Sequence, residues 1–444
     1  MDKLIKAVEK NRDLILNSHE WLWKNPETGY KEVKTSKYLE DAYEKLGYEV
    51  IRAGDIPGFY VKIDTGRPGP EVMILGELDS LVCPNHKDAD PETGAVHCCG
   101  HSAQSAALLG IAAALKEPGV LDNLSGKIRL CAVPAEELIE IEYRKELMKE
   151  GKIKYFGGKA EFLYRGYFDG VDIAFMVHTN SDFCTLAGSV GCMAKKISYK
   201  GVSAHAGGNP WEGCNALYAA NQGLSAINAI RETFKENDLI RVHPIITHGG
   251  EVVNAIPELV TIESYIRGLS FEAIKAANEK VNRALCGGAL ALGANIEIED
   301  MPGYTPHIND KNMIELSKDA AEIALPELEY VVSDTYTTGC TDMGDLSAIM
   351  PIVHPYISGA EGKSHGEDYV IADPETACVG SAKWQVTMLA LLLENNAQRA
   401  EKIIKEFKPR FASKKEFFDC LDSINSSGER ITYNDDGSVT VKVK

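Results

Sequence analysis

The sequence has 444 residues, 44% of them hydrophobic and 25% charged, which is the composition of an ordinary globular protein. Its formal net charge is −18 and its lysines and arginines are scattered along the chain, so we expect no nucleic-acid partner. A chain of this length suggests about two or three domains and can bury a large core.

The N-terminal residues Met1–Lys6 indicate the start of an amphipathic helix and lack the apolar core of a signal peptide. No run approaches the roughly eighteen apolar residues of a membrane span, so we expect none. The 11 cysteines are spread over the whole chain. We interpret them as reduced thiols of a cytoplasmic protein.

The first part of the chain, up to about Gly188, predicts an α/β fold. Residues 2–46 are expected to be mostly helical, with a turn at Asn25–Gly29. A helix of small residues, Ser102–Leu115, is expected to be buried on most of its surface. Runs typical of strands lie at Tyr60–Ile63, Glu71–Leu75, Ile128–Val133 and Val171–Val177. This alternation favours a parallel or mixed sheet covered by helices.

Beyond Gly188 the pattern changes to a compact α+β unit, which we interpret as an inserted domain. Its predicted elements are Met193–Lys200, Asn215–Thr233, Val260–Arg267, Phe271–Leu285 and Ala294–Glu299. The α/β pattern resumes near Tyr304, and Lys383–Phe407 is predicted to be one long helix. A hairpin is predicted around Asp436–Gly437.

Several residues suit a metal ion. Cys99 and His101 stand two positions apart around a glycine, so both side chains can reach one cation from a tight turn. Thiolate and imidazole are preferred ligands of zinc and other first-row metals. An additional carboxylate can serve a metal-assisted hydrolase as its base. The other candidates follow apolar runs or lie in a glycine-rich loop: Glu136, Glu137, His178 and His365.

Each of these residues has a simpler interpretation when taken alone. Cys99 could be a buried thiol, His101 a hydrogen-bonded core histidine, and Glu136–Glu137 the start of an acidic helix. Together they favour a metal site, because adjacent carboxylates at a strand end are costly to bury without a cation or a proton. Strand ends are also where α/β sheets bind ligands.

From about residue 10 to residue 405 the sequence resembles the M20 family of metal-dependent peptidases and amidohydrolases, in the branch of bacterial aminobenzoyl-glutamate hydrolases and plant auxin-conjugate hydrolases. The motifs that match, in the family's order, are Leu78–Leu81, His97–His101, Pro134–Glu137, Gly157–Ala160, Ser203–Ala206, Asn254–Pro257 and Thr341–Asp345.

The resemblance implies an α/β, mixed-sheet metallohydrolase catalytic domain of the phosphorylase/hydrolase-like type, formed by residues 1–188 and 303–410. Residues 189–302 would be an inserted α+β lid and dimerisation domain, through which the chain would form a homodimer. Residues 411–444 would be a C-terminal extension that carries the predicted hairpin.

The resemblance also implies two divalent metal ions per chain, zinc or manganese, with cobalt or nickel as alternatives. Their ligands would be Cys99 as the bridging residue together with His101, Glu137, His178 and His365.

Five further roles follow from the resemblance. Glu136 would be the general base, and Asp79 would orient His101. His205, on the lid, would reach the active site of the partner subunit and stabilise the oxyanion. Asn254 and Arg267 would hold the carbonyl or carboxylate of the substrate.

The chain departs from the family's pattern in three places. Ser102 and Gln104 stand where many members of the branch have Asp and His, and Glu77 stands where other M20 enzymes have a ligand histidine. A charged insert, Ile139–Glu146, follows the acidic pair. We expect this insert to shape the substrate pocket, with a solvated surface helix as the alternative.

The sequence therefore predicts a metal-dependent amidohydrolase that cleaves the amide bond of an N-acyl amino acid, an aminobenzoyl-glutamate-like compound or a dipeptide. A catalytically silent, metal-bound protein that binds a small molecule on the same fold is the alternative. A zinc-structured scaffold fits less well, because structural zinc sites are closed and usually rich in cysteine.

Overall fold

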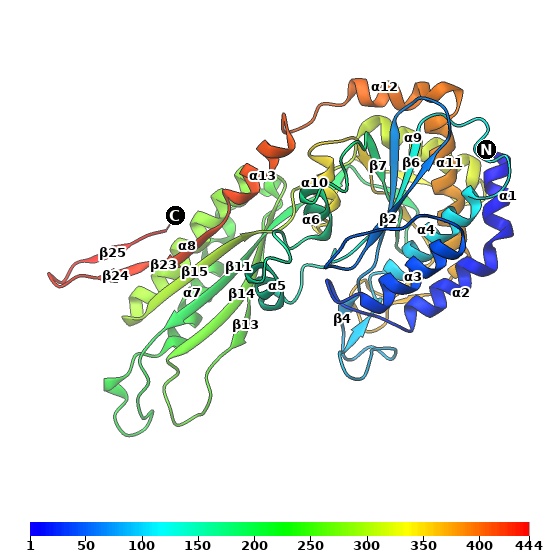
Figure 1. The fold of residues 1–444 in the computed structure, drawn as a ribbon. Helices are drawn as coiled ribbons and strands as arrows, with labels where there is room; N and C mark the ends of the chain where they lie inside the picture. Colours follow the sequence, from blue (N-terminus) through cyan, green and yellow to red (C-terminus); the bar gives the residue numbers. More distant parts are fainter. Residues whose placement is uncertain (444) are drawn as a thin grey trace. The chain divides into compact units, whose positions relative to one another are not determined.

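The computed structural model describes residues 1–443. The chain divides into two compact units (Figure 1). The first unit contains Met1–Gly188, Ile308–Tyr336 and Thr341–Phe411. The second contains Ser189–His307, Thr337–Cys340 and the chain from Ala412 onward.

The first unit is built on a mixed six-stranded sheet. Its strands, in spatial order, are β1 (Ile51–Arg52), β2 (Phe59–Asp64), β6 (Lys127–Val133), β3 (Glu71–Glu77), β7 (Ile173–Phe175) and β19 (Ile352–Val353). β6, β3, β7 and β19 run parallel, while β1 and β2 form an antiparallel edge. The buried runs in β3 and β6 are those of central parallel strands, covered on both faces. The predicted mixed α/β sheet is confirmed.

Helices of small and apolar residues cover this sheet. All residues of α4 (His101–Leu115) are buried, and the helix packs against β3 and against neighbouring helices. Its small side chains allow this close packing: a Cβ at Gly110 would lie 2.4 Å from Ile15 Cδ1. The other helices around it are α1 (Asp2–Lys10), α2 (Arg12–Trp23), α3 (Val33–Lys45) and α11 (Ser381–Leu393), with α9 (Lys311–Ala324) on α11.

The predicted single helix over Lys383–Phe407 is wrong. α11 ends at Leu393, and α12 spans Gln398–Glu406. Between them Asn395, Asn396 and Ala397 all have positive φ angles, of 53°, 57° and 58°. Asparagine tolerates this left-handed region better than most residues, so the Asn pair supplies a break that apolar periodicity alone does not reveal.

One segment, Glu375–Leu393, is long and apolar enough to cross a membrane by composition alone. Most of it is buried in the hydrophobic core of the first unit, where Trp384, Met388 and Leu392 are inaccessible to solvent. It is therefore a core helix of this fold.

The second unit is an α+β layer. Its sheet has the order β12 (Arg241–Val242), β14 (Leu259–Gly268), β11 (Gly191–Lys200), β15 (Asn295–Pro302) and β23 (Ser426–Glu429), and β13 (Ile245–His248) also pairs with β14. Helices α7 (Ala216–Ile230) and α8 (Phe271–Leu292) pack on its apolar face. Ser270 caps the start of α8, and Gly293 ends it with a φ of 70°. Every predicted strand and helix of this part is present, although α8 is longer than predicted.

The C-terminal segment belongs to this sheet. Helix α13 (Lys414–Asp422) precedes β23, which pairs with the edge of β15. β24 (Ile431–Tyr433) and β25 (Val439–Val441) form a hairpin in which Gly437 has a φ of 81°. The predicted hairpin is confirmed, and the turn has the positive φ that Asp-Gly sequences favour.

Short elements complete the chain: β4 (Leu81–Val82), β5 (Ala95–Val96), α5 (Ile141–Lys149), α6 (Gly158–Tyr164), β8 (His178–Thr179), β9 (Cys184–Thr185), β10 (Gly188–Ser189), β16 (His307–Ile308), β17 (Val331–Val332), β18 (Tyr336–Thr337), α10 (Met343–Ser347), β20 (Tyr356–Ile357), β21 (Ala360–Glu361) and β22 (Val370–Ile371).

Candidate metal centre

The candidate ligands gather at one end of the first unit's parallel strands. Glu77 ends β3, the acidic pair Glu136–Glu137 follows β6, and His178 follows β7. The order β6–β3–β7 places these strand ends side by side. His101 is the first residue of α4, which packs on β3. These side chains therefore meet where α/β sheets bind ligands.

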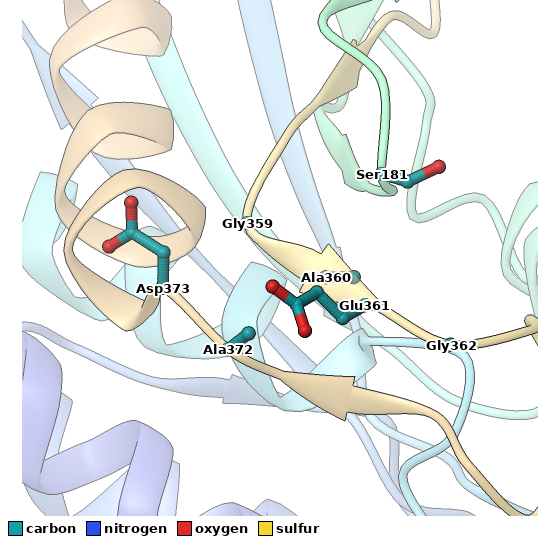
Figure 2. Close-up of a pocket in the computed structure, with 7 residues that line it drawn as sticks. All are labelled: Ser181, Gly359, Ala360, Glu361, Gly362, Ala372 and Asp373. Atoms are coloured by element: carbon teal, nitrogen blue, oxygen red, sulfur yellow. The ribbon is translucent and has the colours of Figure 1, made fainter.

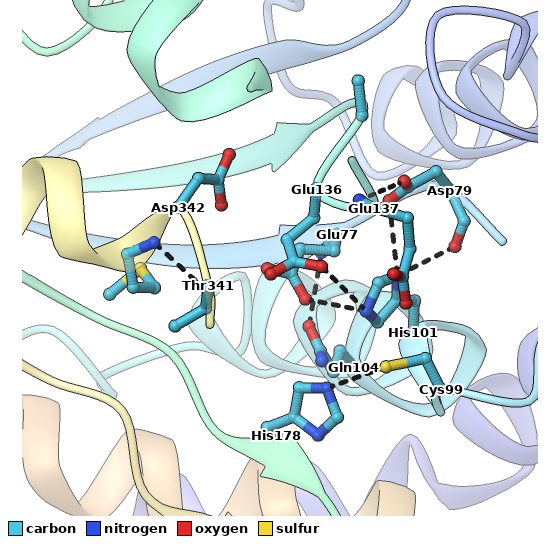
Figure 3. Close-up of polar contacts among 12 residues, drawn as sticks. Glu77, Asp79, Cys99, His101, Gln104, Glu136, Glu137, His178, Thr341 and Asp342 are labelled. Atoms are coloured by element: carbon cyan, nitrogen blue, oxygen red, sulfur yellow. Dashed lines mark hydrogen bonds and ion pairs between the residues drawn. The ribbon is translucent and has the colours of Figure 1, made fainter. Parts of the chain in front are cut away.

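One thiol is shared by two sets of candidate ligands. Figure 3 shows this thiol, on Cys99, together with His101, His178 and Glu137. Cys99, His101 and His178 form one set, and Cys99, Glu137 and His365 form the other. Cys99 Sγ lies 3.5 Å from His178 Nε2 and 3.4 Å from His365 Nε2, and the latter is 3.2 Å from Glu137 Oε1. Ligand atoms around a tetrahedral zinc ion lie roughly 3.3–3.6 Å apart, as its bond lengths require. The two sets therefore fit two cations joined by one sulfur.

Hydrogen bonds orient the two histidines of the first set. His101 Nδ1 lies 2.9 Å from the backbone oxygen of Asp79 and 3.3 Å from its Oδ1. His178 Nδ1 lies 2.8 Å from the backbone oxygen of Thr179. If Nδ1–H donates to these oxygens, each ring presents the lone pair of Nε2 to the site. Asp79 Oδ2 also accepts a hydrogen bond of 2.8 Å from the backbone N–H of Glu137.

Two buried acceptors face each other beside this set. His101 Nε2 and Glu77 Oε2 are 3.2 Å apart, and neither makes a hydrogen bond among residues 1–443. Without a cation, a proton on Nε2 can lie between them: burial lowers the pKa of His101, but Glu77 and Cys99 outweigh it and raise this pKa well above its usual value. In the neutral form that metal ligation requires, the imidazole would oppose the carboxylate with a lone pair, which is unfavourable in a buried site. A cation between or beside them would satisfy both groups.

The local charges favour the ligand forms of Cys99 and Glu137. Burial and Glu137 raise the pKa of the Cys99 thiol, but His101 and His178 outweigh them and lower it to about 6. Burial also raises the pKa of Glu137, and the neighbouring His365 and His101 lower it to about 2. At neutral pH both groups would be anions, as metal ligation requires.

Glu136 is a third acid in the same place. It is buried, and its Oε2 lies 4.0 Å from His101 Nε2. Burial, then Glu77 and Glu137, raise its pKa well above the usual range of a glutamate. A raised pKa is what a residue needs to accept and return a proton near neutral pH.

Sequence analysis assigned no role to Lys159 and Asp342, which complete the site. Lys159 Nζ donates to Glu77 Oε1 at 2.6 Å and to Asp342 Oδ1, and all three side chains are fully buried. The backbone N–H of Lys159 donates to Asp342 Oδ2 at 2.9 Å. Burial opposes the charge of Lys159, but Asp342, Glu77 and Glu136 raise its pKa above the usual range. Nothing in the local pattern of this lysine signals burial, although both residues lie in segments that match the family.

The predicted lid residues lie in the second unit. His205 Nδ1 accepts hydrogen bonds from the backbone N–H groups of Gly207 at 3.2 Å and Gly208 at 2.9 Å. Asn254 is its neighbour through the backbone, since its carbonyl accepts from the N–H of Ala206 at 2.9 Å. Arg267 lies near the end of β14 and donates to the carbonyl of Thr338 at 3.0 Å. The structure brings His205 and Asn254 together within this unit, and the roles of all three remain predictions.

A pocket of 590 Å³ lies among loops that lead to and from the ligands (Figure 2). Its lining includes Ser181, which follows His178 in the chain, and Glu361, which precedes His365. The Asp373 carboxylate in its wall accepts from the N–H and hydroxyl of Thr376. None of the candidate ligands lines it, so this pocket is separate from the metal centre.

Comparison with known proteins now identifies the family. The profile of peptidase family M20/M25/M40 matches residues 73–388. The chain belongs to this family. The predicted resemblance is confirmed, and membership makes the chain a hydrolase of amide bonds.

Its relatives act on small amides, according to their names. The chain is 29% identical to a mouse Xaa-Arg dipeptidase, over 76% of this chain and 73% of that protein. It is 27% identical to an N-acetyl-L-cysteine deacetylase of Bacillus subtilis, over 84% of this chain and 86% of that protein. These relatives agree with the predicted amidohydrolase and give no support to a catalytically silent binding protein.

A solved structure shows the same fold. A dinuclear-metal-binding M20 peptidase from Bacillus subtilis has a TM-score of 0.62 to this chain at 21% identity, and the alignment covers 87% of this chain and 99% of that one. The predicted fold class is confirmed.

Replacing Cys99 with alanine removes the one ligand that both sets share. We expect Cys99→Ala to weaken the binding of both metal ions by at least about 100-fold, since each ion loses one of its three ligands and the loss of a group that only orients a ligand already costs about 10–100-fold. Metal content after dialysis and isothermal titration would measure this. Cys98→Ala is the matched control, because the adjacent Cys98 is also buried but belongs to neither set. Full metal content in Cys99→Ala would contradict the shared-ligand arrangement.

Proposed function

We propose that this protein is a binuclear, metal-dependent amidohydrolase that cleaves an N-acyl amino acid or a dipeptide-like amide. The observation that carries the proposal is the arrangement around Cys99: two ligand sets share its thiol, and Glu136 lies beside them, in a third group with Glu77 and His101 that does not contain Cys99. We infer zinc or manganese as the native ion, with cobalt or nickel as alternatives, because the donors are a thiolate, imidazoles and a carboxylate.

Bound divalent ions would polarise the scissile carbonyl and make water more acidic. The chain's own residues supply the rest of the chemistry. Glu136 takes a proton from the attacking water and returns it to the leaving amine. Asp79 holds the ring of His101, and Lys159 offsets part of the buried negative charge beside Glu136.

The proposed substrate has an amino acid as its leaving group. Both named relatives, the Xaa-Arg dipeptidase and the N-acetyl-L-cysteine deacetylase, release an amino acid by name. Arg267 is the proposed carboxylate binder, because a guanidinium can hold a carboxylate through two hydrogen bonds. Asn254 and His205 are proposed to contact the scissile carbonyl, with His205 stabilising the oxyanion.

We further propose that the second unit is a lid through which two chains form a homodimer. Its sheet has one edge covered by the chain's own β23. At the opposite edge β13 exposes Ile245 and Ile246, and Val253 is exposed in the following loop. Unpaired apolar edge strands tend to associate, so a second copy of this edge is a suitable partner.

A cytoplasmic location, without membrane or nucleic-acid partners, is also proposed. All cysteines are free thiols, including the buried Cys131 and Cys378. Reduced thiols are typical of the cytoplasm. The net charge of −18 disfavours binding to nucleic acid.

Glu136→Gln tests the proposed base. The substitution keeps the shape of the side chain but removes its ability to hold a proton, so we expect kcat to fall by about 10²–10⁴-fold while both metal ions stay bound. Amine release from a panel of N-acyl amino acids, aminobenzoyl-glutamate and dipeptides, with zinc or manganese, would measure this. Glu142→Gln, at an exposed residue of α5, is the matched control. Unchanged turnover in Glu136→Gln would remove this residue from the base role.

Mixed dimers test the role of His205. If this residue completes the partner's site, equal amounts of Glu136→Gln and His205→Ala chains should recover about a quarter of the wild-type activity after subunit exchange, because half of the dimers are then mixed and each has one intact site. Each variant alone should stay nearly inactive. Mixtures that form dimers without regaining activity would show that His205 does not act across the subunits.

A further inference from the structure

The insert after the acidic pair forms a helix with a buried face. In α5, Ile141, Arg144 and Leu147 are buried, at a spacing that places them on one side. Arg144 is only 1% exposed, although it is a charged residue of a largely charged segment. The alternative of a fully solvated surface helix is therefore wrong, and the burial of an arginine needs a reason.

The guanidinium of Arg144 binds backbone carbonyls on both sides of Glu136. Nη2 donates to the carbonyl of Glu137, and Nη1 donates to that of Phe156 at 2.6 Å and, more weakly, to that of Ala135 at 3.5 Å. An arginine can form such a fan of bonds because its planar head carries five N–H donors in a rigid arrangement.

The segment that Arg144 holds is strained. Ala135, directly before the acidic pair, is fully buried and has a φ of 57°. Residues with a Cβ rarely adopt this left-handed region, because the Cβ then lies too close to the following carbonyl oxygen. Such a conformation persists only where neighbouring groups enforce it.

Buried carboxylates hold the same segment from the other side. Glu32 Oε1 accepts the N–H of Ala135 at 2.7 Å, and Asp79 Oδ2 accepts the N–H of Glu137 at 2.8 Å. Side-chain carboxyl groups thus accept the N–H groups of Ala135 and Glu137, and Arg144 donates to the carbonyls of the same two residues. The direction of both side chains of the acidic pair depends on this set of bonds.

The turn before α3 fixes Arg144 in its place. Glu140, at the start of the insert helix, accepts hydrogen bonds from Thr28 Oγ1 at 2.6 Å and Lys31 Nζ at 2.5 Å. The guanidinium carbon lies 5.5 Å from the centre of the Tyr30 ring. Gly29 leaves the room that the guanidinium fills, since a Cβ there would lie 2.6 Å from Nη2 and 3.0 Å from the Cα of Ala135.

From these contacts we propose that Arg144 is a positioning residue: it fixes the backbone around Glu136 so that Glu137 can ligate its cation and Glu136 can reach the substrate. The insert therefore has a defined role: it supplies the arginine that holds the backbone of the acidic pair. The inference rests on the proposed function for the identity of Glu136 as base and Glu137 as ligand. Because only one of the two ligand sets contains Glu137, the loss of Arg144 should affect the two ions unequally.

Titration of the metal-free full-length chain with Co²⁺ tests this. Cobalt bound to thiolate absorbs light, so each binding step can be followed by spectroscopy and by isothermal titration without any substrate. In Arg144→Met we expect the ion at Cys99, Glu137 and His365 to bind about 10–100-fold more weakly, as is usual when a group that orients a ligand is lost. The ion at Cys99, His101 and His178 should keep its wild-type affinity and spectrum.

Arg129→Met is the matched control. Arg129 is also 1% exposed, and it donates to the carbonyls of Tyr167 and Asp169 and to the Glu71 carboxylate, away from the acidic pair. A general loss of stability would appear in both variants, whereas the selective loss of one ion should appear only in Arg144→Met. If Arg144→Met does not fold, Gly29→Ala gives the answer, because its methyl group meets the guanidinium and the Ala135 backbone beside it, while every charge and ligand is retained; it should weaken the same ion.

Wild-type affinity for both ions in Arg144→Met, or an equal loss of both ions in Arg144→Met and Arg129→Met, would overturn the inference. If Arg144→Met does not fold, wild-type affinity for both ions in Gly29→Ala would overturn the inference. These outcomes are independent of turnover. A wild-type chain that binds both ions but cleaves no amide would instead contradict the proposed function, and would leave intact the role of Arg144 in positioning Glu137.

Discussion

The need to compensate buried negative charge governs this protein's first unit. Five carboxylates and a thiol lie buried at one end of its parallel strands: Glu77, Asp79, Glu136, Glu137, Asp342 and Cys99. Burying each of these groups in its ionised form costs several kcal/mol unless an opposite charge lies close to it, and the raised pKa of Glu136 reflects that cost. Lys159 supplies one positive charge, in contact with Glu77 and Asp342. The buried negative charge that Lys159 does not compensate suits a centre that binds two divalent cations, with Cys99 as the ligand common to both.

The two ligand sets differ in the backbone that supports them. His101 begins the regular helix α4, and His178 begins β8, so their set is held by ordinary secondary structure. The other set depends on left-handed residues: Ala135 precedes the acidic pair, and His365 itself has a φ of 63°. The backbone N–H of His365 donates to the carbonyl of Cys98 at 2.9 Å, which holds this loop beside the residue that carries the shared thiol. Left-handed backbone at residues other than glycine persists only where the surrounding structure enforces it. The hydrogen bonds of Arg144 to the backbone of the acidic pair are therefore part of what shapes the metal centre.

Sequence analysis predicted the parts that depend on local pattern. Apolar runs located β3, β6 and α4. The candidate ligands stand out through local pattern too: Cys99 and His101 by their spacing, Glu137 and His178 because they follow apolar runs. Features that depend on contacts between distant parts of the chain could not be predicted from the sequence. The burial of Lys159 depends on Asp342, which is far away in the chain, and no periodicity indicates that pairing. The role of Arg144 depends on room left by Gly29 and on carbonyls of a strained loop, and a charged helix alone suggests only a solvated surface. The break after Leu393 arises from three left-handed residues within an otherwise helical pattern.

The most direct test of this account is anomalous diffraction from crystals grown with Zn²⁺ or Mn²⁺, recorded at the absorption edge of the metal. Two peaks are expected in each chain, both within about 2.5 Å of Cys99 Sγ, as metal–sulfur bonds require. One peak should lie beside His101 and His178, and the other beside Glu137 and His365. A single peak, or a second peak that does not contact Cys99, would contradict it.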